Sequence, residues 1–506
     1  MCGLFASNDP QVFRVPLDFK ARLDFRGPDA QSGLMSFNGW GLYHARLSII
    51  GLSDEYNQPF QDPEGNILVY NGEIFNYEKL GQEKFKIKFE SDTEFLSTYL
   101  TSGKCNFNEL EGFFSFIRID KFGNLTHAVR DKFGVKPLYY ITNLQGNLSF
   151  SSEASLLAQL YQKNFSQEKI ERYQSFRACL SSESLFSDIR SVDPGTCLIT
   201  GRYFDPISVI EECSELNLDP DIDLLEEIVE ASVNSRLVSD VSIGLLYSGG
   251  IDSNLIHTYA PKLDKFTSGH SGDYDVETAE ELEGVNIEII ESRKYLNLAR
   301  DMIASKGEPL GVPNEVALAS LAKNWSSKGG KVMLSGEAAD EFFGGYDKIY
   351  KWALSTQSFD IIEVFKRYAY SNSNRSFEYF QSLFDDTEHL SPFNRLRAFF
   401  VKYHLPVLFR RLDFSLMFAG IEGREPLASE ALFRYACSLN PDSLFLNNQG
   451  KMPLRALLQK RSSGHLAFKP KVGFPIDVKK IITGKKALDR KEIYNSWINF
   501  NLKEVK

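Results

Sequence analysis

The hydrophobic pattern of this chain changes near residue 200, and the change divides the sequence into two parts. Before it, short β-type runs such as 67–70, 113–119 and 148–151 are separated by turn residues, which predicts a sheet-rich domain with few helices. After it, apolar strand patterns alternate with helix patterns, which favours a parallel sheet. From about residue 347 the chain is helical and rich in Phe and Leu, so we expect helices to be added around that sheet.

The segment 201–222 lies between the two patterns and is predicted to be a linker. It carries Asp205-Pro206 and Asp219-Pro220 and shows no sustained hydrophobic period. We therefore expect one domain at 2–200 and a second at 223–506. The length of 506 residues agrees with two or three domains of roughly 150 residues each.

The composition excludes several classes of protein. With 43% hydrophobic and 25% charged residues the chain can bury real cores, and no apolar run reaches the roughly 18 residues of a membrane-spanning helix. The N-terminus lacks the basic region of a secretory signal, and a net charge of −10 argues against nucleic-acid binding as the main task. Six scattered cysteines without metal-ligand spacing indicate reduced thiols and a cytoplasmic protein.

Cys2 stands in an unusual place for a cysteine. After removal of the initiator methionine it would carry the free α-amino group, whose pKa near 7.7–8.0 allows it to act as a base beside its own thiol. The alternative interpretation is a small N-terminal hydrophobic residue without a chemical role.

Six motifs occur in order after the initiator and favour the nucleophile. They are Cys2–Phe5, Arg26–Asp29, His44–Ile49, Tyr70–Asn76, Ser91–Glu94 and Arg130–Tyr139. Together they resemble the glutaminase domain of class II glutamine amidotransferases. The resemblance implies an α+β N-terminal-nucleophile fold with four αββα layers, and glutamine as substrate.

The residue types in these motifs suit glutamine. Arg46 can hold the α-carboxylate through a bidentate fork, and Asp92 can pair with the α-ammonium, with Glu73 nearby. The resemblance implies that the Asn71 side-chain amide and the Gly72 backbone N–H form the oxyanion hole for attack by the thiol. Viewed singly, Arg46 and Asp92 could form a surface salt bridge, and Asn71-Gly72 could be a turn.

A second constellation lies where a buried strand pattern meets a helix pattern, at 245–253. The loop Ser248-Gly249-Gly250 and the following helix N-terminus offer backbone N–H groups to phosphate, and Ser248 and Ser253 add hydroxyl donors. Asp252 is acidic and makes best sense as a Mg²⁺ ligand. The alternative is an ordinary tight turn with Asp252 as the N-cap of the helix.

Further motifs accompany this loop. They are Ser235–Val241, Leu334–Tyr346, Gly420–Leu427, Lys451–Arg455 and Lys471–Phe474. With the loop they resemble the glutamine-hydrolysing asparagine synthetases, an ATP-pyrophosphate-loop family whose second domain is an α/β parallel-sheet nucleotide-binding domain with helical additions.

This resemblance implies roles for individual residues. ATP binding falls to Leu246, Ser248, Gly249, Gly250, Asp252, Ser253, Ser268, Ser335 and Gly336, with Mg²⁺ on Asp252 and Asp340. Lys471 would stabilise charge on the α-phosphate, and Glu337 would assist amide formation at the acceptor.

Four departures from the family pattern concern the acceptor. Tyr247 and Ala338 replace the usual Leu and Gly, and 427–429 and 307–315 differ from the segments of aspartate-using members. The predicted function is adenylation of an acceptor carboxylate with MgATP and its amidation by ammonia from glutamine, with L-aspartate giving L-asparagine. Amidation of another carboxylate, such as a uronic-acid sugar, is the alternative. A non-catalytic sensor on the same fold is a third interpretation, and a homodimer is compatible with the family.

Overall fold

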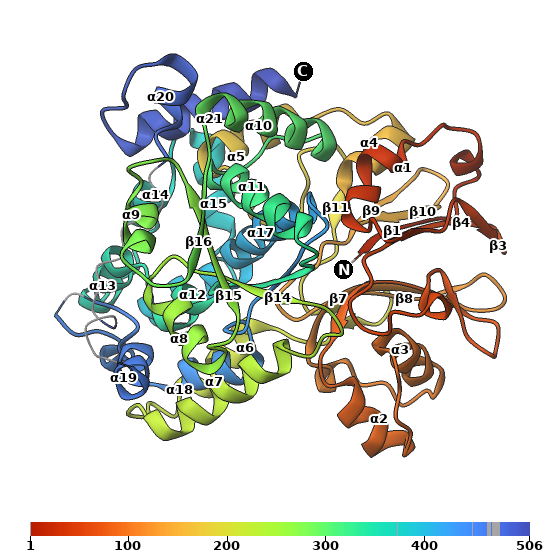
Figure 1. Cartoon of the computed structure of the whole chain (residues 1–506), viewed down its shortest axis with the longest axis horizontal. Coiled ribbons are helices and arrows are strands. Elements are labelled where there is room, and N and C mark those ends of the chain that lie inside the picture. Colours follow the sequence, from red (N-terminus) through yellow and green to blue (C-terminus); the bar gives the residue numbers. More distant parts are fainter. Residues whose placement is uncertain (1, 372, 448, 463–466, 468–475, 506) are drawn as a thin grey trace.

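Two antiparallel sheets face each other in the N-terminal part of the computed structural model, which describes residues 2–371, 373–447, 449–462, 467 and 476–505 (Figure 1). The first sheet contains β1 (Cys2–Ser7), β2 (Ala30–Gln31), β3 (Met35–Phe37), β4 (Trp40–Arg46), β9 (Tyr139–Thr142), β10 (Leu148–Ser151) and β11 (Arg190–Ser191). The second contains β5 (Phe60–Gln61), β6 (Ile67–Ile74), β7 (Gly112–Ile119), β8 (Leu125–Arg130), β12 (Thr196–Cys197) and β13 (Gly201–Arg202).

Side chains that alternate along these strands build four layers. Leu4 on β1 packs between the sheets against Val69 and Ile117, whereas its neighbour Phe5 packs on the outer face. Helices α1 (Phe19–Arg22) and α4 (Ala154–Tyr161) cover the first sheet, and α2 (Tyr77–Phe85) and α3 (Asp92–Thr101) cover the second (Figure 1). This αββα arrangement confirms the predicted N-terminal fold.

A parallel sheet forms the centre of the C-terminal part. Its strands lie in the order β16-β15-β14-β17-β18. They are β14 (Ile243–Leu246), β15 (Asp264–Gly269), β16 (Val285–Ile289), β17 (Val332–Leu334) and β18 (Glu422–Arg424). All neighbouring pairs are parallel, which confirms the α/β prediction and brings the carboxyl ends of the strands to one edge.

Helices connect and surround this sheet (Figure 1). Those that precede or follow its strands directly include α7 (Ile222–Arg236), α8 (Ile251–Tyr259), α9 (Tyr274–Glu280), α10 (Ser292–Lys306), α11 (Asn314–Ser327), α12 (Ala339–Phe343) and α17 (Leu405–Met417). The additions are α13 (Asp347–Ser355), α14 (Ile361–Tyr368), α15 (Asn374–Ser382), α16 (Pro392–Phe399), α18 (Glu430–Ser438), α19 (Met452–Arg461), α20 (Val478–Thr483) and α21 (Arg490–Glu504). Within the described ranges, none of the helices combines the length and apolar character needed to cross a bilayer.

Two helices were not expected in the regions around the linker. Helix α5 (Gln167–Phe176) lies near the end of the N-terminal part, and α6 (Pro206–Ser214) lies inside the predicted linker. The linker is therefore partly helical. Proline at the first position starts α6, the Asp205 side chain caps it, and Ile207 and Ile210 are buried in the C-terminal core.

A buried cluster of charges joins the two parts of the chain. Arg26 is fully buried, and its guanidinium donates to the Cys2 carbonyl at 3.1 Å, to Glu153 at 2.8 Å and to Asp413 on α17 at 2.9 Å. Arg410, one turn earlier on α17, also binds Glu153. Because two arginines and two carboxylates share one dry site, each charge needs the others as partners.

Replacing Arg26 with Met should destabilise the protein by about 3–5 kcal/mol, since Asp413 would keep a buried charge without its main partner. Urea unfolding measures the change. Lys84→Met is the matched control, because Lys84 and Glu109 pair on the surface with side chains 36% and 35% exposed, and such a pair contributes under about 1 kcal/mol. Equal effects of the two substitutions would contradict the role of the cluster.

Candidate active sites

Cys2 begins the central strand β1 and is 6% exposed. Its antiparallel partner across β1 and β4 is Arg46, and its backbone N–H donates to Asn71 Oδ1 on β6 at 2.9 Å. Burial raises the pKa of the Cys2 thiol, so the thiol is neutral near pH 7 and needs a base before it can attack a carbonyl. The predicted base, the α-amino group, belongs to the same residue.

Asn71 and Gly72, the predicted oxyanion-hole residues, lie on β6, and Asn71 contacts the backbone of Cys2. The Asn71 side chain is fully buried, and its Nδ2 has no hydrogen-bond partner in the described part of the chain. A buried unsatisfied amide is unfavourable unless a ligand accepts from it. Gly72 has a φ of 145°, and a Cβ there would lie 2.0 Å from the Phe113 carbonyl oxygen, so only glycine fits. Neither residue is in a surface turn.

Arg46 does not form a surface salt bridge. It is 5% exposed, and its guanidinium donates to the Ser53 carbonyl at 2.9 Å, to Asn57 Oδ1 at 2.8 Å and to the Gly51 carbonyl. These bonds use three of the five N–H donors of an arginine. The side chain thus holds the loop 51–57 and keeps two donors for a carboxylate.

Asp92 and Glu73, the two acids predicted to bind the ammonium, are both buried. The Tyr70 hydroxyl donates to Asp92 Oδ2 at 2.7 Å, and the Ile74 N–H donates to the same oxygen at 3.1 Å. Glu73 is 4% exposed, and its Oε2 has no hydrogen-bond partner among the described residues. Burial raises the pKa of both carboxyls, Glu73 most strongly, and the charge of Asp92 raises the pKa of Glu73 further. A substrate ammonium placed between them would relieve this cost.

Strand β18 of the parallel sheet sends charged side chains to this glutamine site. Burial and the neighbouring Asp92 and Glu422 raise the pKa of Glu73, while Arg424 lowers it. Arg424 is fully buried, binds Glu422, and donates to the carbonyls of Arg236 at 2.9 Å and Val238 at 2.6 Å. Although burial opposes ionisation, Arg424 holds the pKa of Glu422 at about 2. Glu422 and Arg424 of the C-terminal part therefore influence the pKa of Glu73 in the predicted glutamine site.

The same strand supports the second site. The Ser335 N–H donates to the Arg424 carbonyl at 2.8 Å, and Leu334 pairs with Arg424 across β17 and β18. Ser335 and Gly336 follow β17, Leu246 ends β14, and Ser268 lies on β15. The structure thus brings these four predicted ATP-binding residues together at three neighbouring strand ends. The Ser268 hydroxyl donates to the Ala317 carbonyl at 2.9 Å.

The phosphate loop runs from β14 into α8 as predicted. Gly249 has a φ of 70°. The Asn254 side chain donates to the carbonyls of Gly249 at 2.7 Å and Gly250 at 2.9 Å, and these two hydrogen bonds hold the loop against α8. The N-cap of α8 is Gly250, so the interpretation of Asp252 as the N-cap is wrong. Ser248 is exposed, while the Ser253 hydroxyl donates to the Gly250 carbonyl at 3.2 Å.

Asp252 and Asp340 converge on one cation, the Lys451 ammonium. Lys451 Nζ lies 2.7 Å from Asp252 Oδ2 and 2.7 Å from Asp340 Oδ1. The pair of carboxylates suits Mg²⁺, which is commonly bound by one or two protein carboxylates together with phosphate oxygens. The described ranges contain no cluster of three or more His, Cys, Asp or Glu side chains suited to a metal.

Two predicted catalytic residues remain. Glu337 follows Gly336, and besides burial its charge helps to raise the pKa of Glu341 and of Glu425, so it lies near both. Lys471, with the rest of its motif 471–474, lies outside the described residues.

Sequence reasoning gave no role to several residues that the structure places at these sites. They are Arg26, Tyr70, Glu422, Arg424 and Lys451. Each belongs to a motif that the sequence displays, so a signal was present. Their partners come from distant strands, however, and no local pattern indicates such a contact.

The fold and the two sites define a two-domain protein of the glutamine amidotransferase class. A family model described as a glutamine amidotransferase domain matches residues 1–203, and one described as asparagine synthase matches residues 224–496. The chain belongs to the asparagine synthase family, whose model covers more than half of it.

Relatives of this chain carry the same or a related description. It is 32% identical over 362 residues to asparagine synthetase (glutamine-hydrolyzing) 1 of Bacillus subtilis, covering 67% of this chain and 56% of the relative. It is 31% identical to amidase chry2 of Gibberella zeae, covering 65% and 55%, and 29% identical to asparagine synthetase (glutamine-hydrolyzing) of Asparagus officinalis, covering 68% and 60%. The match therefore spans little more than half the length of these curated relatives.

Arg424→Gln should lower the glutaminase kcat/KM by about tenfold or more, because it removes the cation that faces Glu73 and Glu422. Glutamate release without ATP or acceptor measures the effect. Arg434→Gln is the control, since Arg434 lies in the same domain but pairs on the surface, 40% exposed. A folded Arg424→Gln protein with unchanged glutaminase activity would contradict the contribution of β18.

Proposed function

We propose that this chain is a glutamine-dependent amidotransferase that converts an acceptor carboxylate to an amide, with L-aspartate as acceptor and L-asparagine as product. One observation carries the proposal. Strand β18 contacts both candidate sites, through its backbone at Ser335 and through the side chains of Glu422 and Arg424 near Glu73. A strand that contacts both sites suits a pair of reactions in which one releases ammonia and the other consumes it. The family match and the named relatives agree with it.

The proposed first reaction releases ammonia from glutamine. Two N–H donors of Arg46 bind the α-carboxylate, and Asp92 and Glu73 bind the α-ammonium. The Cys2 α-amine takes the thiol proton, the sulfur attacks the carboxamide carbon, and the Asn71 amide and Gly72 N–H stabilise the oxyanion. Collapse expels ammonia and leaves a thioester, which water hydrolyses to glutamate and free thiol.

The proposed second reaction activates the acceptor. Backbone N–H groups of 248–251 and the hydroxyls of Ser248 and Ser253 bind the phosphates of ATP, with Asp252 and Asp340 holding Mg²⁺. The metal would neutralise phosphate charge when bound. The acceptor carboxylate displaces pyrophosphate to form an acyl-adenylate, and ammonia then displaces AMP. Lys471 and Glu337 are proposed to assist these two steps in turn.

The surroundings of the protein follow from its thiols. All six cysteines are free thiols, which agrees with a reducing compartment, and we place the protein in the cytoplasm. A homodimer stays a prediction.

Cys2→Ala should abolish glutamine-dependent synthesis and spare synthesis from added ammonium, because the thiol acts only on glutamine. Product amide is measured with each nitrogen donor. Cys197→Ala, a buried thiol away from both sites, is the control. Loss of the ammonium-dependent reaction in a folded Cys2→Ala protein would contradict the two-site proposal.

Asp252→Asn should reduce ATP–pyrophosphate exchange by about 30- to 1000-fold, equivalent to about 2–4 kcal/mol, because it removes a charge from the proposed metal and triphosphate site. Glutaminase activity in the same variant should continue. Asp223→Asn, whose side chain is 86% exposed, serves as the control. Near-normal exchange in Asp252→Asn would remove the assignment as a metal ligand.

The acceptor is tested by incubating the protein with ATP, glutamine and aspartate. We expect asparagine, AMP and pyrophosphate in equal amounts. Glutamate release without asparagine would reject aspartate while leaving the glutaminase proposal intact, and a screen of other carboxylic acids for AMP release would then identify the acceptor.

A further inference from the structure

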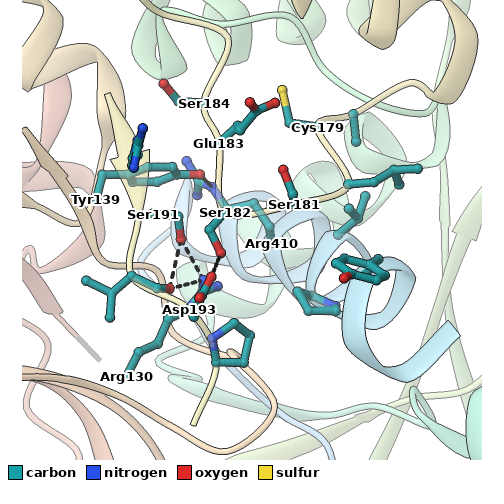
Figure 2. A pocket seen from close by; sticks show the side chains of 18 of the residues that line it. Arg130, Tyr139, Cys179, Ser181, Ser182, Glu183, Ser184, Ser191, Asp193 and Arg410 are labelled. Carbon is teal, nitrogen blue, oxygen red and sulfur yellow. Dashed lines mark hydrogen bonds between the residues drawn. The ribbon is translucent and has the colours of Figure 1, made fainter. Parts of the chain in front are cut away.

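A cavity of about 550 Å³ lies at the seam between the two domains, outside both candidate sites. Its walls come from the segment 177–194, from the loop 306–311 and from the helical region 401–411, besides parts of β8 and β9. The consecutive residues Ser181, Ser182, Glu183 and Ser184 follow one segment along it (Figure 2). None of the residues assigned to glutamine or ATP lines this cavity. Its volume falls in the range of small-molecule sites.

The cavity is strongly cationic in a chain that is acidic overall. Nine of its lining residues are Arg or Lys and three are Asp or Glu, whereas the whole chain has 57 basic and 67 acidic residues. Four of the nine cations lie in ion pairs, namely Lys132, Arg202, Lys402 and Arg410. Arg130 is satisfied by three carbonyls and the Ser191 hydroxyl. Of the other four cations, Lys306 donates to the Pro309 carbonyl at 3.1 Å, and Arg177, Arg190 and Arg411 form no ion pair within the described residues.

Arg177 is held in place without a carboxylate. Its guanidinium lies 4.1 Å from the ring centre of Tyr370 and 4.3 Å from that of Tyr494, so cation–π contacts with two rings hold it. Its Nε is buried and has no hydrogen-bond partner among the described residues. Its backbone has a φ of 63°, a left-handed conformation that arginine rarely adopts. Stacking leaves the edge of the guanidinium free for an anion.

Arg411 lies next to the backbone of Arg177. A Cβ on Gly311 would lie 3.0 Å from the Arg177 carbonyl oxygen, 3.1 Å from Arg411 Cδ and 3.1 Å from Glu315 Oε1, and this carboxylate oxygen already accepts from the N–H groups of Gly311 and Val312. In the described part of the chain no ion pair or hydrogen bond involves the Arg411 guanidinium. Although burial raises the pKa of Tyr368, the charges of Arg177 and Arg411 both lower it, so both guanidinium groups lie near this tyrosine.

A hydroxyl donor lies in the same cavity. The Tyr379 hydroxyl donates to Ser181 Oγ at 3.1 Å, which leaves the Ser181 proton free to donate elsewhere. Ser182, by contrast, is occupied by Asp193 (Figure 2). Guanidinium forks together with a hydroxyl are the usual partners of carboxylate and phosphate oxygens.

We propose that this cavity binds a small metabolite anion through a carboxylate or phosphate group, with Arg177 and Arg411 as the charged forks and Ser181 as a hydroxyl donor. Because its walls come from both domains, the bound anion would stabilise their present arrangement. The site is separate from the proposed reaction and does not depend on it.

Isothermal titration calorimetry of the full chain at low salt tests the proposal, with inorganic phosphate in one arm and succinate in the other. We expect at least one anion to bind, and Arg411→Gln to weaken that binding by about tenfold or more. Arg202→Gln is the matched control, because Arg202 lines the same cavity but is already paired with Asp193 and Asp205. Preference for one arm identifies the phosphate or the carboxylate as the recognised group.

Saturating MgATP is present in both arms so that the added anion does not bind at the nucleotide loop. Any binding that is then weakened in the Arg411 variant is assigned to the cavity. Thermal unfolding without ligand checks that each variant is folded. If Arg411→Gln does not fold, Arg411→Lys keeps the charge, loses the fork, and should still bind several-fold more weakly than the wild type. Absence of binding in both arms, or equal affinity in the wild type and the folded Arg411 variant, would overturn the proposal.

Discussion

Arg26 reaches the Cys2 carbonyl, Glu153 and Asp413 from a fully buried position, and the rest of the molecule depends on this contact. It links the backbone of the nucleophile to a helix of the other domain. Since an unpaired charge in that site is strongly unfavourable, the two domains can pack in few other ways. The position of Cys2 relative to the parallel sheet is thereby fixed.

Strand β18 connects the two candidate sites within this arrangement. Only three residues long, it hydrogen-bonds to Ser335 on one side and directs Glu422 and Arg424 toward Glu73 on the other. A change in the strand therefore alters both sites. Near Glu73, the Asn71 amide Nδ2 and Glu73 Oε2 are buried and have no hydrogen-bond partner among the described residues. Such groups lower stability and are typical of sites completed by a ligand.

The cavity at the seam between the domains also has charged groups that lack an ion-pair partner among the described residues. Four of the nine cations around its cavity lie in ion pairs, whereas Arg177 and Arg411 form no ion pair among the described residues. The two domains thus meet through the buried ion-pair cluster at Arg26 and, one residue after Arg410 on α17, through Arg411, which has no ion-pair partner in the described part of the chain. The first explains how the domains hold together, and the second offers a place where a dissolved anion could act on them.

The sequence by itself determined the two fold classes, the nucleophile and the phosphate loop. Strand alternation and the change of period near residue 200 are local patterns, and Cys2 and Ser248-Gly249-Gly250 carry their chemistry within a few residues. Helix α6 was missed because Asp-Pro pairs signal a turn as well as a helix start, and only packing selects between them. The tertiary structure alone decided that Glu422, Arg424 and Lys451 belong to the sites, because side chains hundreds of residues apart meet only through sheet order and burial, and burial decides what a charge does.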